Sequence, residues 1–387
     1  KLYEDADRKF LQYQYMVQPR IIAVEVTIDI YPENQRFSSS GKYSLINKSG
    51  SGIDTLLVTN SPDVLTELEI DNPVSVILSD KYAGITMLKL HNSMKPGDTI
   101  ILGYHVKSFA NTFLNKNPQV EKNGTYITSL IYPRIGYRPR SITARPEDTI
   151  ALQNHYRSSD ADFIDFTATV STTRSQMAVA PGYLKNHWVE NNRNYFLYQS
   201  DSPVTNDYAF LSGTYIITRD KWKDIDIEIY HHKEHVANTG HMIKGIKATL
   251  EYCEANFSKY QHKQIRIIEY SRSTGDFAQS FANTIPYSEI GFILDINEKG
   301  ERGLNLPFLG ASHELAHQWW GMQVIPADVN GAKMVTESMA EYVSLKVFEK
   351  EYSKAKTLEF LDKSMKTYIT KGIGDETEEL PLIYNTG

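Results

Sequence analysis

The chain has 387 residues, of which 41% are hydrophobic and 11% aromatic, a composition typical of globular proteins large enough for two domains. Its net charge of −6 argues against the basic surface of a nucleic-acid-binding protein, so no nucleic-acid partner is expected. Cys253 is the single cysteine, which excludes an internal disulfide and a multi-thiolate metal site. The first residues resemble neither an initiator methionine nor a signal peptide, and we expect the chain to be a piece of a longer protein.

The first half of the sequence is rich in short alternating stretches. Residues 1–17 are expected to form a linker or short helix. Beyond them, stretches such as 22–30 and 163–170 alternate apolar and polar residues, with Pro, Gly, Asn and Ser between them. This pattern predicts an antiparallel β domain over residues 18–215.

The second half, residues 216–387, mixes a few strands with helices. Apolar runs predict strands at 225–230 and 265–270. Helical periodicity then takes over, and a helix over 240–260 would carry one apolar stripe, made of Met242, Ile246, Leu250 and Cys253. Further helices are expected from about Gly310 or Ser312, over 336–350 and over 353–371. The whole chain is therefore predicted to be an α+β protein of two domains.

Residues 313–317 read His-Glu-Leu-Ala-His, the pattern of a metal-binding helix. Positions i and i+4 of a helix share one face, so His313 and His317 can bind one metal ion. Glu314 lies beside them and can act as a base on water. For the bare pentapeptide the alternative is a buried helix whose histidines only make side-chain hydrogen bonds, and a third ligand decides between the two interpretations.

Glu337 is the predicted third ligand, at the start of a second helix lying across the first. Two histidines and one carboxylate bind zinc and leave the fourth position to water, as a catalytic site requires. Glu341, four residues further on the same face, could accept a hydrogen bond from the second ring nitrogen of His313 or His317. The alternative for Glu341 is a solvated helix charge.

A second histidine group follows the strand predicted at 225–230. His231 and His235 are four residues apart, with His232 and Glu234 between them. They come directly after a strand, however, and the sequence places no second carboxylate close by. This arrangement favours a loop or strand-end role over a second metal site.

With these residues in view, the chain resembles the gluzincin aminopeptidase family, which includes aminopeptidase N and the leukotriene hydrolases. Residues 313–321 resemble that family's HELAHQWFG, residues 337–342 its EGFAEY and residues 285–289 its ITYRE. The resemblance covers most of the chain. It implies a saddle-shaped N-terminal β domain, a thermolysin-like zinc domain that stops before the family's C-terminal helical part, one Zn²⁺ ion, and a peptide or protein substrate.

Three departures from the family pattern shape the functional expectation. The family usually places 18 residues between the second histidine and the glutamate ligand, whereas His317 and Glu337 enclose 19, and we expect a turn at 330–332 to absorb the extra residue. Ser280 occupies the position of the family's amine-binding glutamate, which puts aminopeptidase specificity in doubt unless Glu289 or another carboxylate substitutes. The tyrosine that the family uses for its oxyanion would fall past Gly387.

A subgroup of the family shares these departures. Residues 260–267 and 277–289 resemble the peptidase-like domain joined to bacterial ABC-2 type transporter permeases. The resemblance implies that the chain is the soluble portion of a longer membrane transporter chain, on its external or periplasmic side.

Two functional hypotheses follow. In the first, the chain is a zinc metallopeptidase in which His313, His317 and Glu337 hold zinc and Glu314 is the general base. In the second, it is a zinc-binding, weakly active or inactive peptide-binding or regulatory domain of a transporter. Ser280 favours the second hypothesis, as does the oxyanion tyrosine of the family, whose expected position lies past Gly387. The presence of Glu314 favours catalysis.

Overall fold

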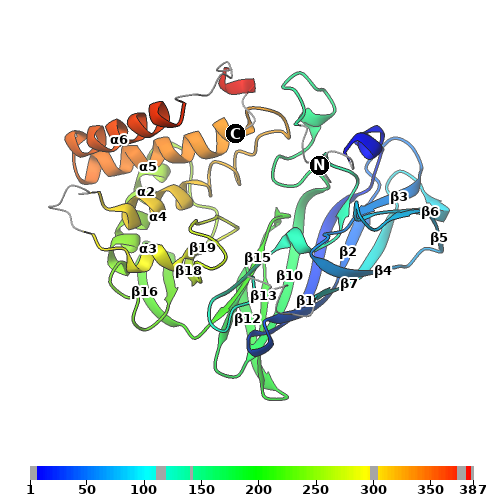
Figure 1. Ribbon diagram of the computed structural model, residues 1–387, viewed down its shortest axis with the longest axis horizontal. Coiled ribbons are helices and arrows are strands. Elements are labelled where there is room, and N and C mark those ends of the chain that lie inside the picture. The colour runs from blue at the N-terminus through cyan, green and yellow to red at the C-terminus, as the bar shows by residue number, and fades with distance from the viewer. Residues whose placement is uncertain (1–6, 110–118, 140–142, 297–303, 373–380, 385–387) are drawn as a thin grey trace. The chain divides into compact units, whose positions relative to one another are not determined.

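The computed structural model describes residues 7–109, 119–139, 143–296, 304–372 and 381–384. The chain divides into two compact units, Lys1–Thr214 with Ala327–Val329, and Tyr215–Pro326 with Asn330–Gly387. Residues Lys1–Thr214 of the first unit are coloured blue to green in Figure 1, and the second unit is coloured green to red.

The described part of the first unit is built from three β-sheets. The largest has eight strands in the order β12-β13-β10-β1-β2-β7-β4, with β14 paired to β10. A three-stranded sheet has the order β11-β15-β8, and a four-stranded sheet has the order β5-β6-β3-β9. The strands are β1 (Arg20–Tyr31), β2 (Arg36–Ile46), β3 (Ile53–Thr59), β4 (Val64–Ile70), β5 (Val74–Asp80), β6 (Ile85–Met94), β7 (Thr99–Ser108), β8 (Thr125–Thr128), β9 (Arg134–Ile135), β10 (Ala161–Thr173), β11 (Met177–Val179), β12 (Tyr183–Glu190), β13 (Arg193–Gln199), β14 (Val204–Thr205) and β15 (Ala209–Gly213). The 3₁₀ turn η1 (Leu11–Tyr13) precedes β1, and η2 (Pro32–Asn34), η3 (Ser129–Ile131) and η4 (Ala151–Gln153) lie between strands.

The alternating stretches form strands because one set of side chains is buried and the other is not. In β1, Val24, Val26 and Ile28 are buried, and the residues between them are more exposed. The strands predicted at 22–30 and 163–170 are confirmed as β1 and β10. These two strands pair in parallel, whereas the other strand pairs of this unit are antiparallel, so the expectation of an all-antiparallel domain is wrong at this one pair.

The second unit contains a four-stranded sheet in the order β16-β17-β18-β19. Its strands are β16 (Ile216–Trp222), β17 (Ile225–His231), β18 (Gln264–Tyr270) and β19 (Thr284–Ser288). The edge strand β16 is antiparallel to β17, while β17, β18 and β19 run parallel. The carboxyl ends of the three parallel strands therefore meet at one edge of the sheet, where ligand sites of such sheets are commonly found.

Helices cover this sheet in the second unit (Figure 1). They are α2 (Thr239–Asn256), α3 (Glu289–Ile293), α4 (Leu306–Ala316), α5 (Met339–Glu351) and α6 (Lys354–Gly372), with a π-helical segment η5 (Met334–Ser338) before α5 and a 3₁₀ turn η6 (Leu382–Tyr384). The stripe predicted on α2 is confirmed, because all four of its side chains are buried in the core. None of the helices in the described ranges combines the length and the apolar character that crossing a bilayer requires.

Two features of the motif region differ from the sequence prediction. Helix α4 begins at Leu306, earlier than the expected start near Gly310 or Ser312, because the Asn305 side chain caps it by accepting a hydrogen bond from the Phe308 N–H at 3.1 Å. The residues before α5 form the π-helical segment η5, which contains Glu337. The turn predicted at 330–332 contains Gly331, which has a φ of 81°. A π-helical turn holds more residues than an α-helical turn, so η5 can also accommodate the extra residue between His317 and Glu337.

The close contact between α2 and α4 depends on Gly245. A Cβ atom at this position would lie 2.6 Å from the Phe308 carbonyl oxygen, a backbone atom that cannot move aside without displacing α4. We predict that Gly245→Ala lowers the free energy of unfolding by about 1 to 3 kcal/mol despite the better helix propensity of alanine. Denaturant unfolding followed by tryptophan fluorescence measures this change, because Trp222, Trp319 and Trp320 lie in this unit.

Gly240→Ala is the matched control for this prediction. It changes the same residue type in the same helix, but no atom lies within 4 Å of the added Cβ. This variant is expected to be neutral or slightly stabilising. Equal stability of the two variants would contradict the proposed role of Gly245.

Candidate metal centre

The last turn of helix α4 and its C-cap present the two histidines of the motif on one side. His313 lies within α4, and His317 is the C-cap residue, whose backbone N–H donates to the His313 carbonyl at 3.3 Å. The imidazole rings of His313 and His317 have centroids 4.8 Å apart and stand nearly perpendicular, at 86°. His317 is nearly buried, and His313 is partly exposed, with side-chain exposures of 8% and 21%. Their Nε2 atoms point toward a common partner from the next helical segment.

That partner is Glu337 of η5. Its Oε2 atom lies 3.4 Å from His313 Nε2 and 3.6 Å from His317 Nε2, and the three ligand atoms lie within 4.8 Å of one another. Ligand atoms bonded to a tetrahedral zinc ion at about 2.0 to 2.2 Å lie roughly 3.3 to 3.6 Å from each other. Two imidazole nitrogens and one carboxylate oxygen at this spacing fit Zn²⁺ with little rearrangement.

Each histidine is oriented through its other ring nitrogen. His313 Nδ1 donates to Glu341 Oε2 at 3.1 Å, and His317 Nδ1 donates to the Trp320 carbonyl oxygen at 3.1 Å. A proton held at Nδ1 leaves the Nε2 lone pair of the neutral ring available as a metal ligand. The sequence left open whether Glu341 meets His313 or His317, and in the structure it contacts His313. The partner of His317 is a backbone carbonyl that side-chain patterns do not reveal.

The carboxylates also set the protonation of the site. Burial disfavours a charged His313, but hydrogen bonds to Glu337 and Glu341 outweigh burial and raise the pKa of His313 to about 10. The same hydrogen bonds from His313 and His317 hold the pKa of Glu337 well below its usual range. Near neutral pH and without metal, the three side chains are therefore an ion-paired cluster that retains a proton on His313.

Glu314 and Tyr287 lie beside the metal-binding group, at α4. Glu314 is 8% exposed. Burial, together with the nearby Glu314 carboxylate, raises the pKa of Tyr287 on β19. A Cβ on Gly310 would lie 2.0 Å from the Tyr287 Oη, so this hydroxyl rests on α4 one turn before Glu314. Tyr287 was not singled out from the sequence as a site residue, although it lies within the stretch 285–289 that resembles the family's ITYRE.

The two predicted substrate-binding residues have other partners. Ser280 is 2% exposed, and its hydroxyl accepts a hydrogen bond from Gln318 Nε2 at 2.7 Å in the core. Glu289 begins α3, where its carboxylate accepts a hydrogen bond from the Arg272 backbone N–H at 3.2 Å. Neither belongs to the group formed by His313, His317 and Glu337. A role for them in substrate binding stays a prediction.

A further group of two histidines and one glutamate lies in the same unit. The expectation that no second carboxylate lies close to the histidines after β17 is wrong, because Glu269 of β18 contacts both His232 and His235. The carboxylate comes from a neighbouring strand more than thirty residues later, which a local reading of the sequence does not detect. His231, the histidine first considered, is instead buried in β17, with its Nε2 2.8 Å from Thr218 Oγ1.

Comparisons with known proteins support the fold. The sequence matches no protein-family model, and a search of curated proteins finds no significant match. Among solved structures, a mutant M1 zinc metallopeptidase from Deinococcus radiodurans aligns over 94% of this chain and 77% of its own, with a TM-score of 0.61 and 13% identity. The same peptidase with a bound Tyr-Ser-Ala substrate gives a TM-score of 0.60, with the same coverage and identity. A two-domain M1 zinc metallopeptidase bound to L-tryptophan gives 0.57 over 86% of this chain and 71% of its own, also at 13% identity.

At this identity the likeness is one of fold. The chain has the α+β fold of the M1 zinc metallopeptidases, with a β-rich N-terminal part followed by the unit that carries the histidine and glutamate group, so the predicted fold class is confirmed.

The raised pKa of His313 predicts a pH-dependent zinc affinity. A metal ion must displace the proton held by His313, so the apparent affinity for Zn²⁺ should rise roughly tenfold per pH unit and keep rising between pH 7 and 8.5. A histidine of ordinary pKa, about 6.5, would give a nearly flat profile above pH 7.5. Competition with a chelator of known pH dependence measures this slope, and a flat profile would contradict the prediction.

Glu341 is expected to strengthen zinc binding through His313. Glu341→Ala should weaken the Zn²⁺ affinity about 10- to 100-fold, because His313 loses the acceptor that fixes its ring and its tautomer. Glu349→Ala is the control: it removes a glutamate of the same helix that pairs with Lys346 at 3.0 Å and does not belong to the metal-binding group. Native affinity in Glu341→Ala, measured by the same competition, would show that the contact has no role in the site.

Proposed function

We propose that this chain is a zinc-dependent metallopeptidase that hydrolyses peptide bonds. One observation carries the proposal: the ligand atoms of His313, His317 and Glu337 converge, and Glu314 follows the first histidine on the same helix. The M1 zinc metallopeptidase fold supports it, and one such peptidase was solved with a tripeptide substrate. The proposed cofactor is one Zn²⁺ ion, and the proposed substrate is a peptide or protein.

The residues of the site divide the chemistry between them. Zinc held by the three ligands would polarise the scissile carbonyl and lower the pKa of a water molecule. Glu314 takes the proton of the attacking water and returns it to the nitrogen of the leaving amine, so that one peptide bond and one water become a carboxylate and an amine. Glu341 and the Trp320 carbonyl keep both imidazoles oriented during this exchange.

The buried position of Ser280 bears on specificity. Its hydroxyl is neutral and hydrogen-bonded to Gln318, so it supplies no anion for the free amino terminus of a substrate. We infer that the enzyme cleaves peptides with free and with blocked amino termini at comparable rates. Strong preference for free amino termini would instead mean that another carboxylate, such as Glu289, binds the amine.

The second candidate function is a zinc-binding peptide-recognition domain of an ABC-type membrane transporter. The same buried Ser280 favours it, because a binding domain needs no anchor for the substrate amine. Metal binding without turnover on any peptide would support this candidate against the peptidase.

Glu314→Gln tests the catalytic proposal. The amide cannot accept the proton of water, so turnover should fall about 10²- to 10⁴-fold while one equivalent of Zn²⁺ still binds the ligand group of His313, His317 and Glu337. Glu251→Gln, on α2 with a 62% exposed side chain, is the matched control and should retain native activity. Fluorogenic peptide cleavage and metal analysis give the two readouts, and native turnover in Glu314→Gln would overturn the assignment.

A further inference from the structure

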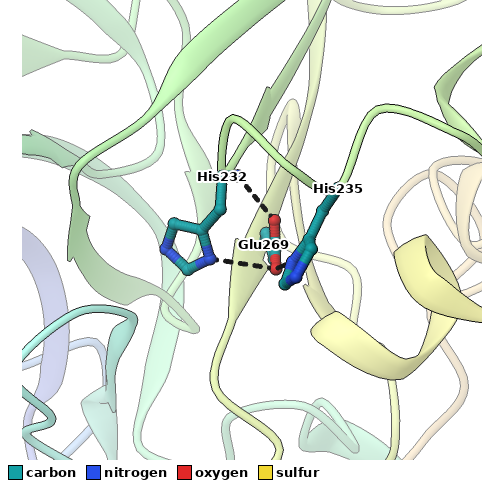
Figure 2. A group of neighbouring side chains, drawn as sticks. All are labelled: His232, His235 and Glu269. Atoms are coloured by element: carbon teal, nitrogen blue, oxygen red, sulfur yellow. Dashed lines mark hydrogen bonds and ion pairs between the residues drawn. The ribbon is translucent and has the colours of Figure 1, made fainter.

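A second group of metal-binding residue types lies at the carboxyl edge of the parallel strands. His232 follows the last residue of β17, His235 lies in the loop that leads to α2, and Glu269 is the penultimate residue of β18. Strands β17 and β18 pair in parallel with Tyr230 opposite Ile268, which brings the end of one strand beside the other. The three side chains come together in Figure 2.

The imidazoles of His232 and His235 contact the same oxygen of the Glu269 carboxylate. His232 Nδ1 lies 3.1 Å from Glu269 Oε1, and His235 Nδ1 is also in contact with that oxygen (Figure 2). All three ligand atoms lie within 4.8 Å of one another. This is the same donor set, two imidazole nitrogens and one carboxylate oxygen, that the first site offers to zinc.

The group is held by contacts that do not involve its ligand atoms. The His232 backbone N–H donates to Glu269 Oε2 at 2.7 Å, which leaves Oε1 for the histidines. A turn closed by a hydrogen bond from the His235 N–H to the His232 carbonyl at 2.9 Å brings the second histidine back to the first. The Tyr215 ring stacks on His232 at 5.7 Å and 19°, and its hydroxyl donates to the Glu269 carbonyl at 2.8 Å.

A positive charge near Glu269 stabilises its buried carboxylate. Its side chain is fully buried, and among the described residues its ion-pair partners are His232 and His235. Burial would raise the pKa of Glu269, but the hydrogen bonds from the two histidines outweigh burial and lower it. An ionised, buried carboxylate requires a counter-charge, which either a histidine proton or a metal ion in its place can supply. The histidine side chains are 16% and 24% exposed, so an ion can reach them from solvent.

We propose that His232, His235 and Glu269 bind a divalent transition-metal ion such as Zn²⁺ or Co²⁺, at a site separate from that of His313, His317 and Glu337. Nitrogen and carboxylate ligands without thiolate select such ions over Ca²⁺, Mg²⁺ or Cu⁺. The bound ion ties the loop between β17 and α2 to β18 and so stabilises the folded unit. Metal binding at this second site does not require peptidase activity.

The second site is the weaker of the two. Ligating histidines normally donate their other ring N–H to an acceptor, as both histidines of the first site do. His232 Nε2 is buried and has no hydrogen-bond partner in the described part of the chain. We therefore expect an affinity at least about tenfold lower than that of the first site.

Metal stoichiometry of the native protein is the first test. Equilibrium dialysis against Zn²⁺ followed by elemental analysis should give two equivalents, filled in two steps. His235→Asn should bind one equivalent, because the Asn amide can still donate a hydrogen bond to Glu269 but cannot ligate a metal through nitrogen. His91→Ala, which changes an exposed histidine of β6, should keep two equivalents.

The second site can be observed alone in the variant His313→Ala/His317→Ala. Added Co²⁺ should give a visible absorption band and a higher Tm, and both effects should disappear when His235→Asn is added. One equivalent in the native protein, or two equivalents in His235→Asn, would overturn the proposal. Unchanged Tm and stoichiometry in His235→Asn would show that the histidines only neutralise Glu269 by hydrogen bonding.

Discussion

The packing of helix α4 against α2 and α5 is the interaction on which the second unit depends. Small residues allow the close contacts of α4: Gly245 of α2 leaves no room for a Cβ against the Phe308 carbonyl, and Gly310 of α4 leaves none against the Tyr287 hydroxyl of β19. Ala311, Leu315 and Ala316 are fully buried in the same core. Because the faces of α4 toward its neighbours are closely packed, the helix has little freedom to rotate. Its last turn and C-cap then present His313 and His317 in a fixed direction, and α5 supplies Glu341 to His313.

Charge compensation shapes both histidine and glutamate groups in this unit. In each, one carboxylate oxygen faces two imidazoles, and the hydrogen bonds lower the pKa of that carboxylate. The two groups differ in how they are built. His313 and His317 are one helical turn apart, and each has an acceptor at its other ring nitrogen, whereas His232 and His235 come from a loop beside a strand. A preorganised pair of rings loses less freedom when it binds a metal ion, which explains why the helical group is the better candidate for catalysis.

The prediction from sequence succeeded where the physics is local. The apolar stripe of α2 follows from a period of 3.6 residues, and the strands β1 and β10 follow from alternation. The prediction from sequence failed where contacts outside the periodic stretch determine the structure. The sequence predicts too late a start for α4, because the cap at Asn305 precedes the apolar run. It does not predict the parallel pairing of β1 with β10, which joins residues about 140 positions apart. The Glu269 carboxylate was missed for the same reason, since only the sheet brings it to His232.

The sequence by itself determined the donor types and the helical spacing of His313, Glu314 and His317, because an i, i+4 pair on a helix shares a face whatever surrounds it. It also determined the fold class, through alternation in the first part and helical periodicity in the second. The tertiary structure alone decided that Glu341 meets His313 and that Glu269 meets His232 and His235. It also decided that Ser280 turns into the core toward Gln318 and that Glu337 lies in a π-helical segment. These outcomes depend on packing between segments far apart in the chain, and such contacts leave no periodic signal in the sequence.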